Sequence, residues 1–451
     1  MSSSPPPEWT VVRRGSTRTS PIVLGESPCW DPTSHRLLFV DIESGVVHRL
    51  DPLSGRSESI TLPKGTLVGA IGLVEQQKAG SSGEDSGSRY WIASNHGVHL
   101  LDWSSPLVAA TSPRSTLLLA NPDAPDTRFN DAKVSPCGDL IAGTIVTESN
   151  AAKRRGRGHI FRLSAARFNG MGCENRIDSQ ILLSGATLSN GLDFETDAAT
   201  GQMHLWWIDS AVPKVQCFEM HGQASPAASC SSSAAACACA AACSASNASS
   251  CSCTSAGGCG CASSCLSAAC SCCCAAPSAS ASASASSGPV CLSPLRRSRC
   301  IRTSSPPTAD AASSSVASSS SGSLSLAGVP DGMTFDSEGC LWIALSGAGV
   351  VARCTTQGQL LRVIRFPVSK VTSVCFGGPN MRTLFVTSAA KGVDMHKEPL
   401  AGSVFSVPDV GVAGRAMFRL PGRFTLEDSA PTEVMQHQSV EDIPATLRAK
   451  L

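Results

Sequence analysis

Four residues of this 451-residue chain carry oxygen donors at equivalent places in a repeated pattern: Glu26, Asn130, Asn190 and Asp331. Their two carboxylates and two amides suit a hard divalent cation such as Ca²⁺, Mg²⁺ or Mn²⁺, with Zn²⁺ as an alternative. Two carboxylates also balance the charge of such an ion, which makes a buried site less costly. The competing interpretation is that these side chains cap strands or turns, as Asn and Asp commonly do. Their shared register favours the metal site.

The elements that must position these residues are six short segments with one common register. Each segment has a starting residue, a large apolar residue four positions later, a turn and a second apolar run. The starting residues are Glu26, Gly69, Asn130, Asn190, Asp331 and Thr372. The runs are rich in β-branched and aromatic residues and are bounded by Gly, Pro, Asp and Ser, which predicts several β-strands in each unit.

The starting residues are separated by 43, 61, 60, 141 and 41 residues. The shortest spacings match the ~40–45 residues of a four-stranded propeller blade. We therefore predict an all-β fold, a six-bladed β-propeller. Because the innermost strands of a propeller line its central channel, the starting residues are expected to meet at the mouth of that channel.

The longest spacing contains residues 223–327, which are dominated by Ser, Ala and Cys and include one acidic residue and no aromatic residue. Such a composition cannot bury enough apolar surface to offset its ordering entropy, so we predict a long disordered insert in the fourth blade. The predicted organisation is a flexible segment (1–20), two propeller parts (21–222 and 328–426) on either side of the insert, and a polar tail (427–451).

The composition of the chain argues against two classes of binding partner and indicates the cellular compartment. The 36 Lys and Arg residues against 35 Asp and Glu residues argue against a nucleic-acid partner. No apolar run approaches the roughly 18 residues of a membrane span, so no membrane partner is expected. Seven Cys outside the insert are scattered as buried thiols of a reduced, cytoplasmic compartment would be. The terminal Ala449-Lys450-Leu451 approximates a peroxisomal address, which is the alternative location.

Thirteen Cys between Cys230 and Cys274 raise a different possibility, the buffering of soft metal ions by the insert. Their irregular spacing and the absence of Lys to balance thiolate charge argue against it. The Ser, Ala and Cys monotony also fits an expanded repetitive sequence.

Five strings in the globular parts resemble the senescence-marker-protein, gluconolactonase and regucalcin family of six-bladed propellers. They run in the family's order: Leu24-Gly25-Glu26-Ser27-Pro28-Cys29-Trp30, Arg128-Phe129-Asn130-Asp131-Ala132-Lys133, Ser189-Asn190-Gly191-Leu192, Pro330-Asp331-Gly332-Met333 and Val371-Thr372-Ser373-Val374-Cys375-Phe376-Gly377-Gly378-Pro379. Each string alone is weak evidence for this family, whereas the five strings in this order are specific to it. At Ala132 the family has Gly.

The resemblance implies one bound divalent metal ion (Ca, Zn, Mg or Mn) held by Glu26, Asn190 and Asp331. It implies substrate contacts from Arg128, Asn130 and Glu148, although Arg128 could equally be a structural ion-pair partner and Glu148 a solvated loop acid.

The activity that the resemblance implies is hydrolysis of a sugar lactone such as gluconolactone, a small-molecule substrate. The metal would act as a Lewis acid on the lactone carbonyl, and Asp331 as general base and then acid. Two alternatives use the same site: a regucalcin-like calcium-binding regulator without turnover, and an ester or organophosphate hydrolase.

Overall fold

The computed structural model describes residues 8–13, 22–76, 88–103, 115–147, 155–165, 177–212, 214–221, 291–294, 300–302 and 328–421. Glu148, Cys173, the Cys230–Cys274 cluster and the terminal Ala449-Lys450-Leu451 lie outside these ranges. In the described part of the chain, no helix has both the length and the apolar character needed to cross a membrane.

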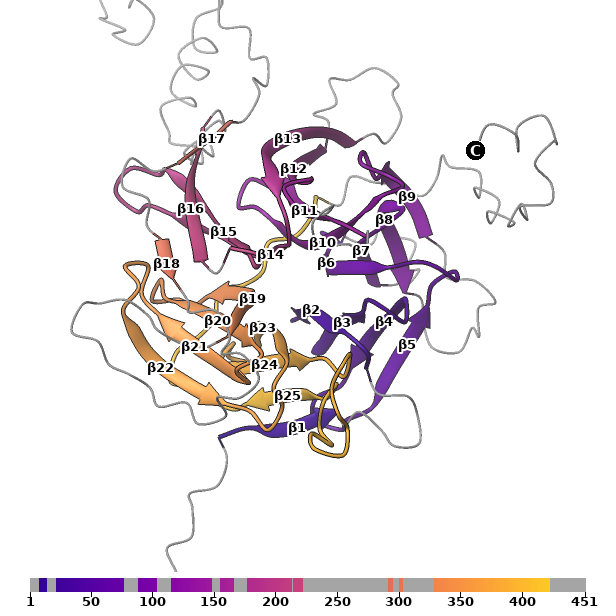
Figure 1. Ribbon diagram of the computed structural model, residues 1–451, viewed down its shortest axis with the longest axis vertical. Helices are drawn as coiled ribbons and strands as arrows, with labels where there is room; N and C mark the ends of the chain where they lie inside the picture. Colours follow the sequence, from indigo (N-terminus) through magenta and orange to yellow (C-terminus); the bar gives the residue numbers. More distant parts are fainter. Residues whose placement is uncertain are drawn as a thin grey trace, which may run out of the picture. The chain divides into compact units, whose positions relative to one another are not determined.

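The described strands form six antiparallel sheets arranged as blades around a central channel (Figure 1), which confirms the predicted six-bladed β-propeller. From the channel outward, the first three blades are β2 (Gly25–Asp31), β3 (Arg36–Asp41), β4 (Val46–Leu50) and β5 (Ser57–Thr61); β6 (Val68–Leu73), β7 (Ser88–Ser94), β8 (Gly97–Trp103) and β9 (Ser115–Ala120); and β10 (Thr127–Val134), β11 (Leu140–Val146), β12 (Gly158–Ala165) and β13 (Ile177–Ala186).

The other three blades have the same strand order, except that blade 4 has a fifth strand and blade 6 takes its outer strand from the N-terminal part of the chain. They are β14 (Ser189–Thr196), β15 (Met203–Asp209) and β16 (Lys214–His221) with β17 (Cys291–Pro294) and β18 (Cys300–Arg302); β19 (Val329–Phe335), β20 (Leu341–Ser346), β21 (Val350–Cys354) and β22 (Leu360–Arg365); and β23 (Val371–Gly377), β24 (Thr383–Ser388), β25 (Val404–Val407) and β1 (Thr10–Arg13). Because β1 comes from the N-terminal end and pairs with β25, the sixth blade closes the ring.

Blade 4 refines the predicted limits of the insert. The outer edge of β16 pairs with two short strands, β17 next to His221 and β18 next to Lys214. Both short strands lie within the predicted insert of residues 223–327, so this part of it completes the blade. These two strands were not predicted because each is very short and is surrounded by Ser and Arg residues.

The blades pack face to face, which explains why their second strands are continuous apolar runs. Leu37, Leu38, Phe39 and Val40 of β3 are all fully buried, since both faces of the sheet meet a neighbouring blade. Trp91, Trp206 and Trp342 occupy the corresponding strands of three other blades and are also fully buried. Of the predicted buried thiols, Cys29, Cys217, Cys340, Cys354 and Cys375 are buried, whereas Cys137 is exposed.

All six inner strands carry an irregularity at the same place. The pairing of each inner strand with the second strand shifts between residues 26 and 29, 68 and 70, 129 and 132, 189 and 192, 330 and 333, and 371 and 374. Each shift contains or adjoins one of the starting residues of the sequence repeat. Because a β-bulge re-aims a side chain and bends its strand, the bulges turn these residues out of the regular sheet.

One further segment, residues 411–421, crosses the end of the channel opposite the mouth (yellow in Figure 1). Gly414 pairs with Asp336 beyond the end of β19, and Leu420 pairs with Val74 beyond the end of β6. Between them, Arg415 stacks on the Phe335 ring at 4.8 Å and donates to the Phe194 carbonyl at 3.2 Å. We call these residues the strap, and they close the far end of the channel.

Candidate metal and substrate site

The four oxygen-bearing residues of the sequence repeat meet where the inner strands begin. A chain of hydrogen bonds joins three of the blades there. The Asn130 amide nitrogen donates to the Asn190 amide oxygen and, at 2.6 Å, to the Ser189 carbonyl. The Asn190 amide nitrogen donates to the Ser210 hydroxyl at 2.7 Å. That hydroxyl donates to the Pro330 carbonyl at 2.5 Å, directly before Asp331.

The same short motif positions the strands that carry Glu26 and Asn190. In blade 1, the Asp41 carboxylate at the end of β3 accepts hydrogen bonds from the backbone of Val23 and Leu24, at 2.9 and 3.0 Å. In blade 4, the Asp209 carboxylate at the end of β15 accepts equivalent bonds from Thr187 and Leu188, again at 2.9 and 3.0 Å. Each inner strand is therefore fixed two residues before its functional side chain.

Close approach of neighbouring inner strands depends on two glycines beside the functional residues. A Cβ atom on Gly191 would lie 2.6 Å from the Asp331 carbonyl oxygen, and one on Gly332 would lie 2.1 Å from the Ser373 hydroxyl. Any larger side chain would push the strands apart and separate Asn190 from Asp331. Ala132, where the family has Gly, lies outside the positive-φ region, so its side chain introduces no backbone strain.

The Glu26 and Asp331 carboxyl groups of the site both have raised pKa values. Burial raises the pKa of Glu26 well above its usual range, and the nearby Asp331 carboxylate raises it further. Burial also raises the pKa of Asp331, with a contribution from Asp131. No hydrogen-bond donor of the described residues reaches the Asp331 carboxylate, whereas Glu26 accepts one bond from the Ser27 backbone at 3.2 Å.

Arg128 lies inside this site and not in a surface ion pair. It is buried, and its guanidinium donates to the Asn130 amide oxygen at 2.6 Å and to the Phe129 carbonyl at 3.1 Å. Burial lowers the pKa of Arg128 to about 10, although the Glu43 and Glu26 carboxylates favour its charge. The geometry therefore brings together five of the six predicted site residues, and Glu148 is outside the described ranges.

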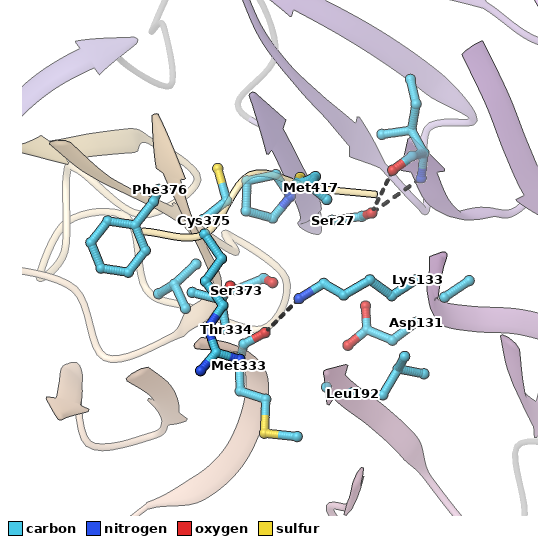
Figure 2. A pocket seen from close by; sticks show the side chains of 16 residues that line it. Ser27, Asp131, Lys133, Leu192, Met333, Thr334, Ser373, Cys375, Phe376 and Met417 are labelled. Atoms are coloured by element: carbon cyan, nitrogen blue, oxygen red, sulfur yellow. Dashed lines mark hydrogen bonds between the residues drawn. The ribbon is translucent and has the colours of Figure 1, made fainter. Parts of the chain in front are cut away.

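Two further residues of the site, Asp131 and Ser210, were not among the predicted site residues. Asp131 lines a cavity of about 30 Å³ inside the channel, together with Lys133, Ser27 and Ser373 (Figure 2). Burial raises the pKa of Asp131 to about 6, against the opposing effects of Lys133 and Arg128. Asp131 directly follows the predicted site residue Asn130, and Ser210 directly follows an apolar strand. These positions were the only features of the sequence that could have indicated a role for either residue.

The central cavity has room for a water molecule but not for a sugar. Its far side is formed by Arg415 and Met417 of the strap, so nothing larger can enter from that end. Lys133 is held in place by an ion pair with Asp193 at 2.8 Å and a bond to the Met333 carbonyl at 3.3 Å (Figure 2). The mouth, where Asn130 and Asp331 lie, is therefore the candidate place for any ligand larger than water.

The donor set fits a divalent cation on chemical grounds. Glu26 is buried and Asp331 is half-buried, and the nearby Asp331 charge disfavours the ionised form of Glu26, a repulsion that a bound cation would remove. The Asn190 amide oxygen accepts one hydrogen bond and keeps a second lone pair. Within the described ranges, no three His, Cys, Asp or Glu side chains gather as a metal site. Amide oxygens would therefore have to complete the ligand set.

Comparison with known sequences agrees with this geometry. The sequence pattern described as "SMP-30/Gluconolactonase/LRE-like region" matches residues 24–243 and 304–390, which is more than half of the chain. The chain belongs to the SMP-30/gluconolactonase/LRE-like family. The matched residues include all six starting residues of the repeat, so the family's sequence pattern and the bulged inner strands coincide.

Relatives within this family match along most of their length. Regucalcin of Xenopus laevis is 25% identical over 400 residues, covering 87% of this chain and 93% of that protein. The 6-deoxy-6-sulfogluconolactonase of Pseudomonas putida is 26% identical over 392 residues, covering 86% and 91%. The structure of a calcium-binding protein, regucalcin, from Agrobacterium tumefaciens superposes with a TM-score of 0.55 at 21% identity, covering 89% of this chain and 95% of that one. This last similarity supports the shared fold.

Proposed function

We propose that this protein is a divalent-metal-dependent lactonase that hydrolyses an aldonolactone such as gluconolactone. The observation that carries the proposal is the convergence of Glu26, Asn130, Asn190 and Asp331 at one mouth, linked by the hydrogen bonds from Asn130 to Pro330. The family membership and a relative named as a sulfogluconolactonase support the same chemistry.

In this proposal Glu26, Asn190 and Asp331 hold the metal ion. A divalent cation at this place would polarise the lactone carbonyl and stabilise the negative charge that develops on its oxygen. Asp331 is suited to proton transfer because no donor of the described residues occupies its carboxylate. It takes a proton from the attacking water and returns it to the leaving alkoxide.

Arg128 and Asn130 orient the sugar. The Arg128 guanidinium is fixed by two hydrogen bonds to neighbouring groups of its own strand. Its remaining N–H groups can donate to sugar hydroxyls without a large loss of side-chain freedom. Glu148 remains a predicted substrate contact.

An Asp331→Asn variant tests the assignment. The proposal expects turnover of gluconolactone to fall by at least about 100-fold, as is typical for loss of a general base. Calcium binding measured by calorimetry should be weakened but retained, since Glu26 and Asn190 remain. Equal turnover by the variant and the unmodified protein would refute the role of Asp331.

A second candidate function is calcium binding without turnover. It is favoured by the regucalcin relatives and by the similar fold of the calcium-binding regucalcin of Agrobacterium tumefaciens. The two functions separate in one experiment. A regulator binds calcium and hydrolyses no aldonolactone with any of Ca²⁺, Zn²⁺, Mg²⁺ or Mn²⁺, whereas a lactonase turns over with at least one.

A further inference from the structure

A second polar cavity, of about 380 Å³, opens on blade 3. It is lined by Asp123, Ala124, Asp126, Thr127, Arg157 and His159. Asp123, Ala124 and Asp126 belong to the connection from β9 into the inner strand β10, and Thr127 is the first residue of β10. Arg157 lies in the turn before β12, and His159 is the second residue of that strand. Both connections lie at the end of the blade where β10 begins, which is the side of the mouth. Thr127 directly precedes Arg128 in β10, so the cavity and the candidate site share this inner strand.

The walls of this cavity are fixed by hydrogen bonds. The Asn121 amide donates to the Thr127 carbonyl at 3.0 Å, and the Thr127 hydroxyl donates to the Asp123 carbonyl at 3.0 Å. The His159 Nδ1 and the Asp123 Oδ2 are 2.7 Å apart, and the Thr144 hydroxyl donates to the same carboxylate oxygen at 3.3 Å. A binding surface with such fixed groups loses little freedom when a ligand binds.

Two polar atoms remain available to a ligand. With Nδ1 bonded to Asp123, the ring nitrogen left on His159 is Nε2, which has no partner among the described residues. The Asp123 Oδ1 likewise accepts no hydrogen bond from them. The Arg157 guanidinium also lines the cavity, 3.6 Å from the exposed Asp126 carboxylate, and its planar group carries five N–H donors.

The charges and hydrogen-bonding groups that line this cavity indicate which class of ligand it can bind. Two carboxylates face one guanidinium, so the cavity disfavours an anion. Hydroxyl groups both donate and accept hydrogen bonds, and a row of them matches acceptors on Asp123 and His159 beside donors on Arg157. The volume lies within the range of small-molecule sites.

We propose that this cavity is a subsite for a polyhydroxyl group attached to the lactone ring, such as the second sugar of a disaccharide aldonolactone. The proposal rests on the proposed function for the lactone itself. It makes His159 and Arg157 residues that determine specificity, and it places disaccharide aldonolactones among the substrates.

The test combines kinetics with a binding measurement that needs no turnover. Variants His159→Gln and Arg157→Gln are compared with matched controls, His396→Gln on an exposed loop and Arg155→Gln in the same turn as Arg157. Hydrolysis of cellobionolactone and of gluconolactone gives kcat/KM for each variant. Calorimetric titration with cellobiitol and with sorbitol gives affinity in the absence of a lactone. Thermal melting establishes that each variant is folded.

The expected result is a loss of about tenfold in kcat/KM for cellobionolactone in both variants, with the value for gluconolactone unchanged. Cellobiitol should bind more tightly than sorbitol, and His159→Gln should remove the difference. Variants that match their controls on both lactones would overturn the subsite, as would equal affinity for the two alditols. If no lactone is hydrolysed but cellobiitol binding still depends on His159, the proposed function fails while the subsite stands.

Discussion

The Asn130 side chain donates a hydrogen bond to the amide oxygen of Asn190, and this bond joins the inner strands of two neighbouring blades at the mouth of the channel. Through this bond Asn130, a predicted substrate contact, orients the amide of Asn190, a predicted metal ligand. The proposed metal site and the proposed sugar site therefore share this hydrogen bond, and a change in one is expected to alter the other.

Replacement of Asn130 by Ala should reveal this coupling. Without its donor, the Asn190 amide is free to turn away from the metal position, and loss of such a supporting partner commonly costs 10–100-fold in metal affinity. Calorimetric titration with calcium checks the prediction, with Asn380→Ala on an exposed turn as the control. Unchanged calcium affinity in Asn130→Ala would show that Asn190 does not depend on its neighbour.

Asp131→Asn should stabilise the metal-free protein in a pH-dependent manner. The pKa of Asp131 is raised to about 6 in the folded protein, so its ionised form is disfavoured by folding. The unmodified protein should therefore lose stability relative to the variant as pH rises from about 4 through 6, by at most about 3 kcal/mol. Below pH 4 the two should be equally stable, because both then carry a neutral side chain.

Urea denaturation of both proteins at pH 4, 5, 6 and 7 measures this difference. Comparison at each pH cancels the opposing effect of His48 and His99, whose lowered pKa values act in the same way in both proteins. A difference in unfolding free energy that does not vary with pH would contradict the prediction.

Replacement of residues 222–290 by Asn-Gly should leave the propeller folded. His221 and Cys291 are paired across β16 and β17, so a two-residue turn can close this hairpin. The connection follows the third strand of the blade, at the end opposite the mouth, and we expect lactone turnover within about twofold of the unmodified protein. Thermal melting and a turnover assay check this, and a shortened protein that fails to fold would assign the segment a structural role.

Arg415→Ala should weaken the strap without removing a site residue. The guanidinium stacks on Phe335 and bonds the Phe194 carbonyl, and loss of both contacts is expected to cost about 1–2 kcal/mol. Denaturation measures the loss, with the exposed Arg365→Ala as the matched control. Equal unfolding free energies for the two variants would show that Arg415 does not help to close the channel.

The repeat register was enough to predict both the fold and the meeting of Glu26, Asn130, Asn190 and Asp331. A shared position in each blade places residues at the same height in the ring, whatever their separation along the chain. The bulges that turn these residues toward the mouth left no pattern of their own in the sequence, because a bulge depends on the pairing of two strands.

Other features required the folded chain because their contacts are unique to one place. The strap has no counterpart in the repeat, and its partners, such as Phe335 and Val74, come from different blades. The bond from Ser210 to Pro330 and the pairing of β18 with Lys214 are likewise single long-range contacts. A prediction from the sequence repeat identifies the features that every blade shares, but it cannot identify contacts that occur only once.

The central claim is that Glu26, Asn190 and Asp331 hold a divalent cation that is needed for lactone hydrolysis. The most direct measurement is gluconolactone hydrolysis by the purified protein before chelation, after chelation, and after addition of Ca²⁺, Zn²⁺, Mg²⁺ or Mn²⁺ in separate samples. If these three residues hold a catalytic cation, chelation abolishes turnover and at least one of these ions restores it. Turnover that is unaffected by chelation, or absent with every ion, would refute the metal-dependent lactonase.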